Sequence, residues 1–285
     1  MTKHNLSKHL EIEPSQLFVG NISNVKSFYA DTLGLQTLES SPSRVLLGHD
    51  NTGIIELISK PKLMHASPRE AGLFHNAILF QSRASLARAA GEMILQRPES
   101  FSGTGDHLVS EAFYFNDPEG NGLELYFDRP EDTWQWQNGR VVMDTLYIDP
   151  LQYISQHAND KLVDDKKIGH VHLRVGDINT ARKFYVDTLG FDITAQVPGA
   201  LFVSVGGYHH HIGLNNWLSE GAGLRSPALG LGNVTMELDS EDAVRNLAAK
   251  IESTEQSFGY ANGKLQVNDP WGNQLSFTAP GNVSS

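Results

Sequence analysis

Residues 115–125 read "FNDPEGNGLEL", and residues 267–277 read "VNDPWGNQLSF". Both contain Asp-Pro-x-Gly-Asn, a composition typical of a tight turn between two strands. Each turn is preceded by a second matching stretch, "SNVKSFYADTLGL" at 23–35 and "NTARKFYVDTLGF" at 179–191. Because both stretches recur in the same order, the chain is a duplication whose boundary falls between Pro130 and Ile168.

A finer repeat lies inside each half. The stretch "HVHLRV" (170–175) alternates apolar and polar residues, as a half-buried strand does. Asp177 is a candidate N-cap for a helix over 178–189, and Gly190 is a candidate helix stop. The same order of strand, helix and about three strands recurs, so we predict an α+β chain of four βαβββ modules. The modules span roughly 11–60, 72–128, 165–217 and 229–280.

The modules group into two halves along the chain. We expect a first half at 1–130, a connecting segment at 131–164 and a second half at 165–285. Each module exposes one apolar sheet face, and it must pack against another module to bury that face.

Composition excludes several classes of function. The 285 residues include no cysteine, which excludes disulfides, cysteine zinc sites and thiol catalysis. The net charge of −11 argues against nucleic acid or an anionic membrane as a partner. No apolar run approaches the ~18 residues that cross a bilayer, and the first residues lack the apolar core of a secretory signal. We therefore expect a cytoplasmic protein.

One carboxylate distinguishes the two turns. Glu124 follows the first turn inside the apolar "GLELY", whereas Ser276 stands at the same place after the second. His75 and His170 fall on the first strands of modules two and three. Taken alone, each residue has an ordinary interpretation. The two histidines could be hydrogen-bonded core residues, and Glu124 could be an exposed strand residue. A buried carboxylate, however, needs a cation or donors, and a metal ion would supply the cation.

These features together resemble a known family. Paired βαβββ modules with "FYxDTLGF" and "DPxGN" are similar to the vicinal oxygen chelate superfamily, which includes glyoxalases, bleomycin-resistance proteins and extradiol dioxygenases. The narrower resemblance is to the extradiol, catechol 2,3-dioxygenase-like enzymes, and "GGYHHHIGLNNW" (206–217) also resembles them. It implies modules paired into two barrel-like domains. The residues that match the dioxygenase signature are Gly105, His107, Phe113, Tyr114, Asp117, Pro118, Gly120 and Glu124.

The resemblance implies a metal site. By position it makes His75, Glu124 and His170 ligands of Fe(II), with Mn(II) as the alternative metal. His172, two residues along the same strand, is interpreted as a packing residue or a neighbour of the ligands. Two imidazoles and one carboxylate on one face of the ion leave open positions, as in non-haem iron oxygenases.

Neither half of the chain holds the whole set. The second half offers His170, but Asn233 and Ser276 stand where the first half has His75 and Glu124. We therefore expect modules two and three to pair around the metal, within one chain or between chains, and modules one and four to form a vacant partner. Glu56, opposite Pro14, is interpreted as non-ligating.

The implied chemistry is insertion of O2 into a catechol-type diol to give a muconic semialdehyde-type product, as in aromatic catabolism. A catalytic base is expected in the histidine run 209–211, interpreted as lying on a late strand of module three. Strand alternation leaves the register open; we prefer His211, then His210, and a polar hairpin edge is the alternative. His107 and Tyr114 match residues that hydrogen-bond the substrate or oxygen.

Other functions on this scaffold stay open. A glyoxalase or isomerase would use Ni, Zn or Mn with four ligands, and the missing carboxylates at Gly213/Leu214 and Ser276 count against it. A sequestering protein of the bleomycin-resistance type needs no metal. A hydroquinone ring-cleaving dioxygenase shares the ligands. Assembly into a homo-oligomer is a further expectation.

Overall fold

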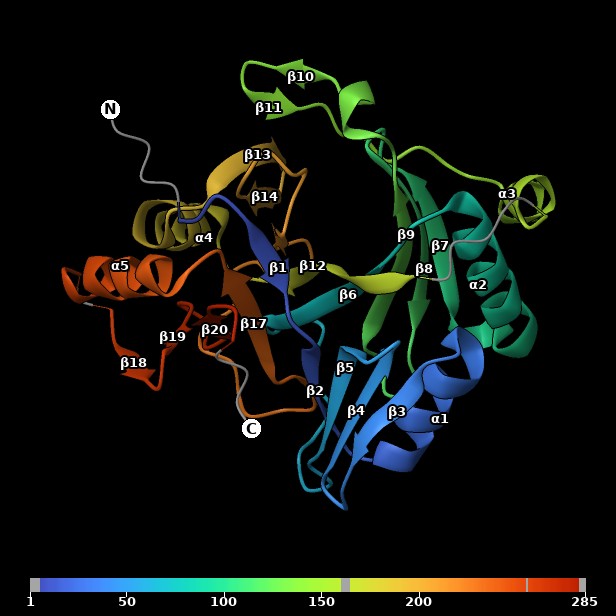
Figure 1. Cartoon of the computed structure of the whole chain (residues 1–285), viewed down its shortest axis with the longest axis horizontal. Coiled ribbons are helices and arrows are strands. Elements are labelled where there is room, and N and C mark those ends of the chain that lie inside the picture. The colour runs from blue at the N-terminus through green and yellow to red at the C-terminus, as the bar shows by residue number, and fades with distance from the viewer. Residues whose placement is uncertain (1–5, 160–164, 255, 282–285) are drawn as a thin grey trace.

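The chain folds as four copies of one module (Figure 1). The computed structural model describes residues 6–159, 165–254 and 256–281; the last five positions of the predicted connecting segment, 160–164, lie outside the described residues. In each module a strand is followed by a helix and then by further antiparallel strands. The predicted α+β architecture of paired βαβββ modules is confirmed.

Modules two and three share one large sheet. Its eight strands are ordered β13-β14-β15-β12-β6-β9-β8-β7. Module two comprises β6 (Gly72–Phe80), α2 (Arg83–Gln96), η1 (Pro98–Ser100), β7 (Phe101–Asp106), β8 (Ser110–Asn116) and β9 (Gly122–Asp128). Module three comprises β12 (Lys166–Arg174), α4 (Ile178–Arg182), η3 (Lys183–Leu189), β13 (Asp192–Val197), β14 (Ala200–Ser204) and β15 (Ile212–Asn215).

The joint between these modules is the antiparallel pair β6–β12. His75 lies opposite His172 in this pair, and Ala77 lies opposite His170. The predicted pairing of modules two and three is therefore confirmed, and it occurs within one chain. The eight-stranded sheet therefore joins strands from both halves of the chain (Figure 1).

Modules one and four form the other pair. Each has a five-stranded sheet, and each sheet borrows one strand from the other module: β1 pairs with β17, and β16 pairs with β2. Module one comprises β1 (Leu10–Ile12), β2 (Ser15–Val19), α1 (Ile22–Leu33), β3 (Gln36–Ser40), β4 (Arg44–His49) and β5 (Thr52–Ser59). Module four comprises β16 (Gly230–Leu231), β17 (Asn233–Leu238), α5 (Glu241–Glu252), β18 (Phe258–Ala261), β19 (Lys264–Asn268) and β20 (Gln274–Thr278).

The repeated Asp-Pro-x-Gly-Asn turn is built identically in both copies. Asp117 Oδ1 accepts hydrogen bonds from the backbone of Glu119 and Asn121 at 2.8 and 2.9 Å. Asp269 Oδ1 accepts the equivalent bonds from residues 271 and 273 at 2.9 and 2.8 Å. Gly120 and its counterpart at 272 have φ of 81° and 82°, a region that favours glycine. The turn is a structural device that places the strand after it.

The helix boundaries follow the predicted caps. Asp177 accepts a hydrogen bond from the Thr180 backbone at 2.7 Å, and Gly190 ends the helix at a φ of 100°. The second part of this helix, η3, is π-helical, which the sequence did not predict. Figure 1 shows α1 and α2 on one side of the molecule and α4 and α5 on the other.

The connecting segment is ordered where it is described. It contains η2 (Glu131–Thr133), the short hairpin of β10 (Trp136–Gln137) and β11 (Arg140–Val141), and α3 (Pro150–His157), which packs against α2. One cluster of buried apolar side chains extends through all four modules. Among the described residues, no helix is both long enough and apolar enough to span a membrane.

Candidate metal centre

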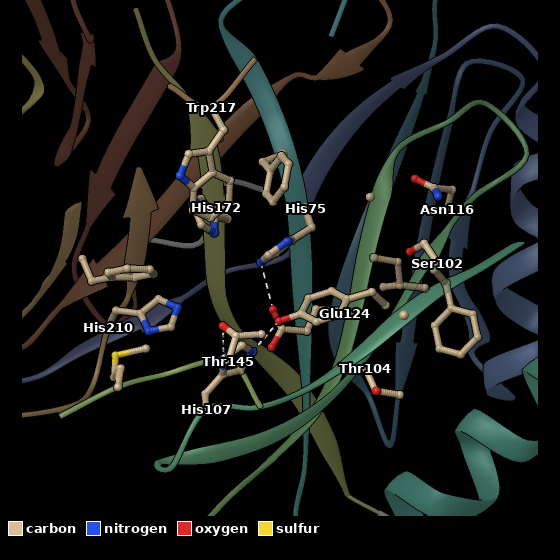
Figure 2. A pocket seen from close by; sticks show the side chains of 18 of the residues that line it. His75, Ser102, Thr104, His107, Asn116, Glu124, Thr145, His172, His210 and Trp217 are labelled. Atoms are coloured by element: carbon tan, nitrogen blue, oxygen red, sulfur yellow. Dashed lines mark hydrogen bonds and ion pairs between the residues drawn. The ribbon is translucent and has the colours of Figure 1, made fainter. Parts of the chain in front are cut away.

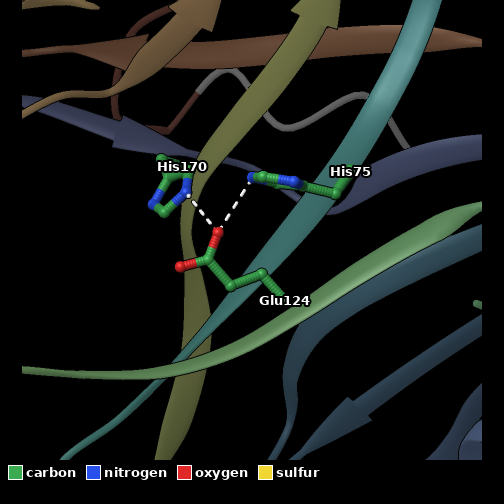
Figure 3. A group of neighbouring side chains, drawn as sticks. All are labelled: His75, Glu124 and His170. Carbon is green, nitrogen blue, oxygen red and sulfur yellow. Dashed lines mark hydrogen bonds and ion pairs between the residues drawn. The ribbon is translucent and has the colours of Figure 1, made fainter. Parts of the chain in front are cut away.

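Three buried side chains from three neighbouring strands converge on one point. Figure 3 shows His75 from β6 and His170 from β12 directed at the same carboxylate oxygen of Glu124 on β9. The Nε2 atoms of His75 and His170 lie 2.9 and 3.2 Å from Glu124 Oε2. The three side chains offer ligand atoms that all lie within 4.8 Å of one another. The structure thus brings together the three residues that the sequence predicted as ligands.

The centre has an unsatisfied polar atom. His75 Nε2 is close to Glu124 but lacks the alignment of a hydrogen bond, so this buried nitrogen has no partner among the described residues. A buried nitrogen without a partner is rare, because it loses its hydrogen bonds to water. A metal ion would satisfy this nitrogen and the carboxylate together, so the donor set fits an ion.

The charge states suit a metal ion as well. Burial alone would raise the pKa of Glu124, but the imidazoles of His170 and His75 hold it well below its usual range. Burial lowers the pKa of His170 to about 4, even though Glu124 acts in the opposite direction. Near neutral pH, Glu124 is therefore ionised and His170 is neutral, the forms that bind metals.

A cavity of about 620 Å³ opens onto the centre. Figure 2 shows His75 and Glu124 among the side chains that line it, with residues from both halves of the chain around them. Trp217, which is 51% exposed, stands at its edge. The apolar part of the lining consists of Phe74, Phe115, Leu123, Met143, Val197, Phe202 and Trp217.

His107 and Tyr114 form a hydrogen-bonded pair in this cavity. His107 Nδ1 lies 2.9 Å from the backbone carbonyl of Asp144, which can only accept, so Nδ1 carries the hydrogen. His107 Nε2 therefore accepts from the Tyr114 hydroxyl, 2.6 Å away. Tyr114 lies directly opposite Glu124 in the β8–β9 pair. The lone pairs of the Tyr114 oxygen remain free to accept a hydrogen from a bound ligand.

The histidine run 209–211 differs from the expectation. The run lies in an irregular segment before β15, which begins at Ile212, so strand alternation does not apply to it. His210 lines the cavity, and its ring centroid lies 4.1 Å from that of His170. His211 lies outside this cavity, and its Nδ1 lies 2.7 Å from Ser204 Oγ. Of the two candidates for the base, His210 borders the cavity and His211 does not.

The ring of His172 occupies the space that a carboxylate on β15 would need in order to act as a fourth ligand. Its register partner on β15 is Gly213, at the position that corresponds to Glu124 on β9. A Cβ atom on Gly213 would lie 2.8 Å from the His172 ring. His172 Nε2 also lies 3.0 Å from the side-chain amide of Asn215, which holds the ring in place. A carboxylate therefore cannot enter here without displacing His172.

The sequence did not identify one wall of the cavity. Met143, Asp144 and Thr145 come from the connecting segment and border the cavity beside His107. That segment has no periodicity that would have linked it to a site. Glu56, interpreted as non-ligating, bonds Arg44 and Gln16, so its carboxylate is already paired.

Comparisons with known proteins agree with this geometry. Residues 8–125 and 167–277 match the model of the Glyoxalase/Bleomycin resistance protein/Dioxygenase superfamily. A catechol-2,3-dioxygenase of Bacillus subtilis (strain 168) is 35% identical over 266 residues, which cover 90% of this chain and 92% of that protein.

Solved structures share the fold at low identity. A candidate dioxygenase from Bacillus subtilis subsp. subtilis str. 168 has a TM-score of 0.67 at 13% identity, over 96% of this chain and 86% of that one. Glyoxalase I from Zea mays has a TM-score of 0.58 at 16% identity, over 96% of this chain and 94% of that one. The chain therefore belongs to the Glyoxalase/Bleomycin resistance protein/Dioxygenase superfamily, and its recognition from the sequence as an extradiol-dioxygenase-like enzyme is confirmed.

Proposed function

We propose that this enzyme cleaves the ring of a catechol-type diol beside its two hydroxyl groups, with Fe(II) and O2. The observation that carries the proposal is the convergence of His75, Glu124 and His170 beside a largely apolar cavity, which His75 and Glu124 line. The relative of Bacillus subtilis named as a catechol-2,3-dioxygenase supports the same reaction class. Mn(II) remains the alternative metal, and the cytoplasmic location and a homo-oligomer stay predictions.

The three ligands would hold the iron through two imidazole nitrogens and one carboxylate. Bound in this way, Fe(II) supplies open coordination positions at which a diol and O2 are brought together. Gly213 and His172 leave no room for a fourth protein ligand at the position equivalent to Glu124. That restriction favours a dioxygenase over a four-ligand glyoxalase.

His107 and Tyr114 would orient the diol. The Tyr114 hydroxyl donates to His107, so its oxygen can accept a hydrogen from a substrate hydroxyl. Burial raises the pKa of Tyr114 well above its usual value, and the neighbouring Glu124 acts in the same direction. Tyr114 therefore stays protonated and acts as an orienting group.

His210 would act as the base that takes a proton from the diol. Its ring lies on the cavity wall across from Ser102 and Asn116 (Figure 2). Burial lowers the pKa of His210 well below its usual value, with neighbouring histidines acting in the same direction. The imidazole is therefore neutral before substrate binds, as a proton acceptor must be.

The cavity would favour a neutral, apolar ring substituent. Its volume of about 620 Å³ falls within the range of drug-sized ligand sites. That volume is larger than a single ring with two hydroxyl groups would fill. No lysine or arginine stands among the described residues that line it, and Asp144 adds a carboxylate. A substituent that carries its own carboxylate would lose water without gaining a cation.

The test is anaerobic reconstitution with Fe(II), followed by a diol and air-saturated buffer. We expect a yellow ring-fission product and oxygen uptake, with kcat/KM at least about 10-fold higher for an alkyl- or phenylcatechol than for a carboxylate-bearing catechol. Hydroquinone is run in parallel. An iron-loaded protein that cleaves neither catechols nor hydroquinones contradicts the proposal, and cleavage of hydroquinone alone moves it to the para-diol reaction.

A further inference from the structure

A chain of hydrogen bonds lies behind His210, on the side away from the cavity. His210 Nδ1 lies 2.7 Å from His209 Nδ1. His209 Nε2 in turn lies 2.7 Å from Asp128 Oδ1. Asp128 is the last residue of β9, the same strand that carries Glu124. One strand therefore supplies both a candidate metal ligand and the end of this chain.

The donors and acceptors in the chain can be assigned from Asp128 outward. A carboxylate only accepts, so His209 Nε2 carries the hydrogen of that bond. In a neutral His209 the other nitrogen, Nδ1, then has a lone pair and must accept from His210 Nδ1. His210 consequently carries its hydrogen on Nδ1, and its Nε2 is unprotonated.

The anchor at Asp128 is itself held in place. Its second oxygen, Oδ2, accepts a hydrogen bond from the Tyr208 hydroxyl at 2.8 Å. The Tyr208 oxygen lies 2.8 Å from the hydroxyl of Tyr126, so both oxygens of the carboxylate are fixed by neighbours. The side chain of Asp128 is 19% exposed, whereas that of His209 is fully buried.

The ring of His209 is also confined by packing. Tyr208 lies against it with ring centroids 4.2 Å apart, and Trp134 contacts it at 5.2 Å. Rotation of the ring would break both of its hydrogen bonds. The geometry therefore specifies one orientation of His209, and through it one tautomer of His210.

We propose that Asp128 and His209 are positioning residues that hold His210 in the tautomer whose Nε2 is unprotonated and can accept a proton from a ligand in the cavity. The catalytic use of this nitrogen rests on the proposed function, but the tautomer does not. Neither Asp128 nor His209 lines the cavity. Their effect is transmitted through the hydrogen bond to His210 Nδ1.

The tautomer is tested by NMR on the full-length, metal-free chain labelled with 15N-histidine. The 15N chemical shift distinguishes protonated from unprotonated ring nitrogens, and we expect His210 Nε2 to be unprotonated in the wild type. In Asp128→Asn the side chain at 128 no longer fixes His209 Nε2 as the donor of their hydrogen bond. The 15N signal of His210 Nε2 should therefore move toward the protonated position. A wild-type His210 with hydrogen on Nε2, as a doubly protonated His209 would produce, overturns the proposal.

Kinetics of the iron-loaded enzyme provide the second measurement. We expect Asp128→Asn to lower kcat by about 10–100-fold while KM for the diol stays within about twofold, as for other partners that orient a functional group. His209→Asn, whose side-chain oxygen can still accept from His210 Nδ1, should retain more activity than His209→Leu. Asp132→Asn, at an exposed position in the following segment, is the matched control and should retain wild-type kcat.

Two results separate this proposal from the proposed function. A wild-type enzyme that cleaves no diol contradicts the proposed function, while the NMR measurement still decides the tautomer. An active enzyme in which Asp128→Asn changes neither kcat nor the His210 signal overturns the positioning role.

Discussion

The strand pairs β6–β9 and β17–β20 have the same register but carry different side chains where the candidate ligands stand. Ala77 faces Glu124 in the first pair, as Thr235 faces Ser276 in the second. In each pair the second strand, β9 or β20, follows the same aspartate-centred turn. In the second pair the Ser276 hydroxyl donates to Asn233 Oδ1 at 3.1 Å.

The difference lies in how the buried polar groups are satisfied. Asn233 and Ser276 satisfy each other, and the amide of Asn233 also donates to Thr235 Oγ1 at 2.8 Å. At the equivalent place in the first pair, His75 Nε2 has no hydrogen-bond partner among the residues described. Protein atoms alone satisfy these polar groups in one copy of the scaffold, whereas in the described part of the other copy His75 Nε2 has no hydrogen-bond partner. The following changes test this contrast.

The largest effect is expected from removal of a ligand. Glu124→Ala and His75→Ala should each lose bound iron, because the remaining two side chains no longer enclose the ion. Ring-cleaving activity should fall by more than about 100-fold, beyond the loss typical for residues that only support a ligand. Metal content after gel filtration and oxygen uptake provide the measurements.

The matched controls are Ser276→Ala and Asn233→Ala in the other strand pair. Both should keep the full iron content. Ser276→Ala loses the hydrogen bond to Asn233, about 1 kcal/mol of stability, and Asn233→Ala loses two hydrogen bonds, about 2 kcal/mol. If the Ser276 and Asn233 variants lost as much iron as the Glu124 and His75 variants, the proposed difference between the two strand pairs would be wrong.

An intermediate effect is expected when the carboxylate is introduced at the other copy. Ser276→Glu buries a charge with neither imidazole beside it, so we expect a loss of about 2–4 kcal/mol of unfolding free energy at pH 7. Ser276→Gln has the same shape without the charge and should lose less. Urea unfolding of both variants measures the difference.

The sign of the pH dependence follows from burial. Burial raises the folded-state pKa of the introduced carboxyl above its unfolded value, so the penalty is present at pH 7. It disappears as pH falls below the unfolded pKa, roughly 4.3, where both states are protonated. Equal stability of the two variants at pH 7 would show that this copy tolerates a carboxylate.

The smallest effect is expected at Glu56, an acidic residue of module one. Glu56→Gln should leave the iron content and activity unchanged, because its carboxylate bonds Arg44 and Gln16. Since Arg44 is 40% exposed, the loss of stability should stay below about 1 kcal/mol. Iron lost from this variant, measured by metal analysis, would place a second centre in module one.

Much of this contrast could be predicted from the residues alone. The repeated turns set the register, and the exchange of Glu124 for Ser276 marked the copy that holds the candidate ligands. His75 and His170 stand on the first strands of modules two and three, and the resemblance to the extradiol dioxygenases implied that they join Glu124 as ligands. The pairing of modules two and three followed from the incompleteness of each half.

Each of the parts that could not be predicted involves a segment outside the regular strands. The run 209–211 precedes β15, so alternation gave no means of choosing between His210 and His211. Thr145 reaches the cavity from a segment without periodicity, and its contact with His107 depends on tertiary packing. The link from Asp128 to His209 joins residues far apart in the sequence, and no local pattern encodes it.

The exchange of strands between modules one and four has a consequence for folding. β1 and β17 bring residues near the two ends of the chain into one sheet, so the loop they close is far longer than that closed by β6 and β12. Longer loops lose more chain entropy on closure and form later. The candidate metal centre, built from the middle of the chain, can therefore assemble first, and the terminal modules then close around it as the last step of folding.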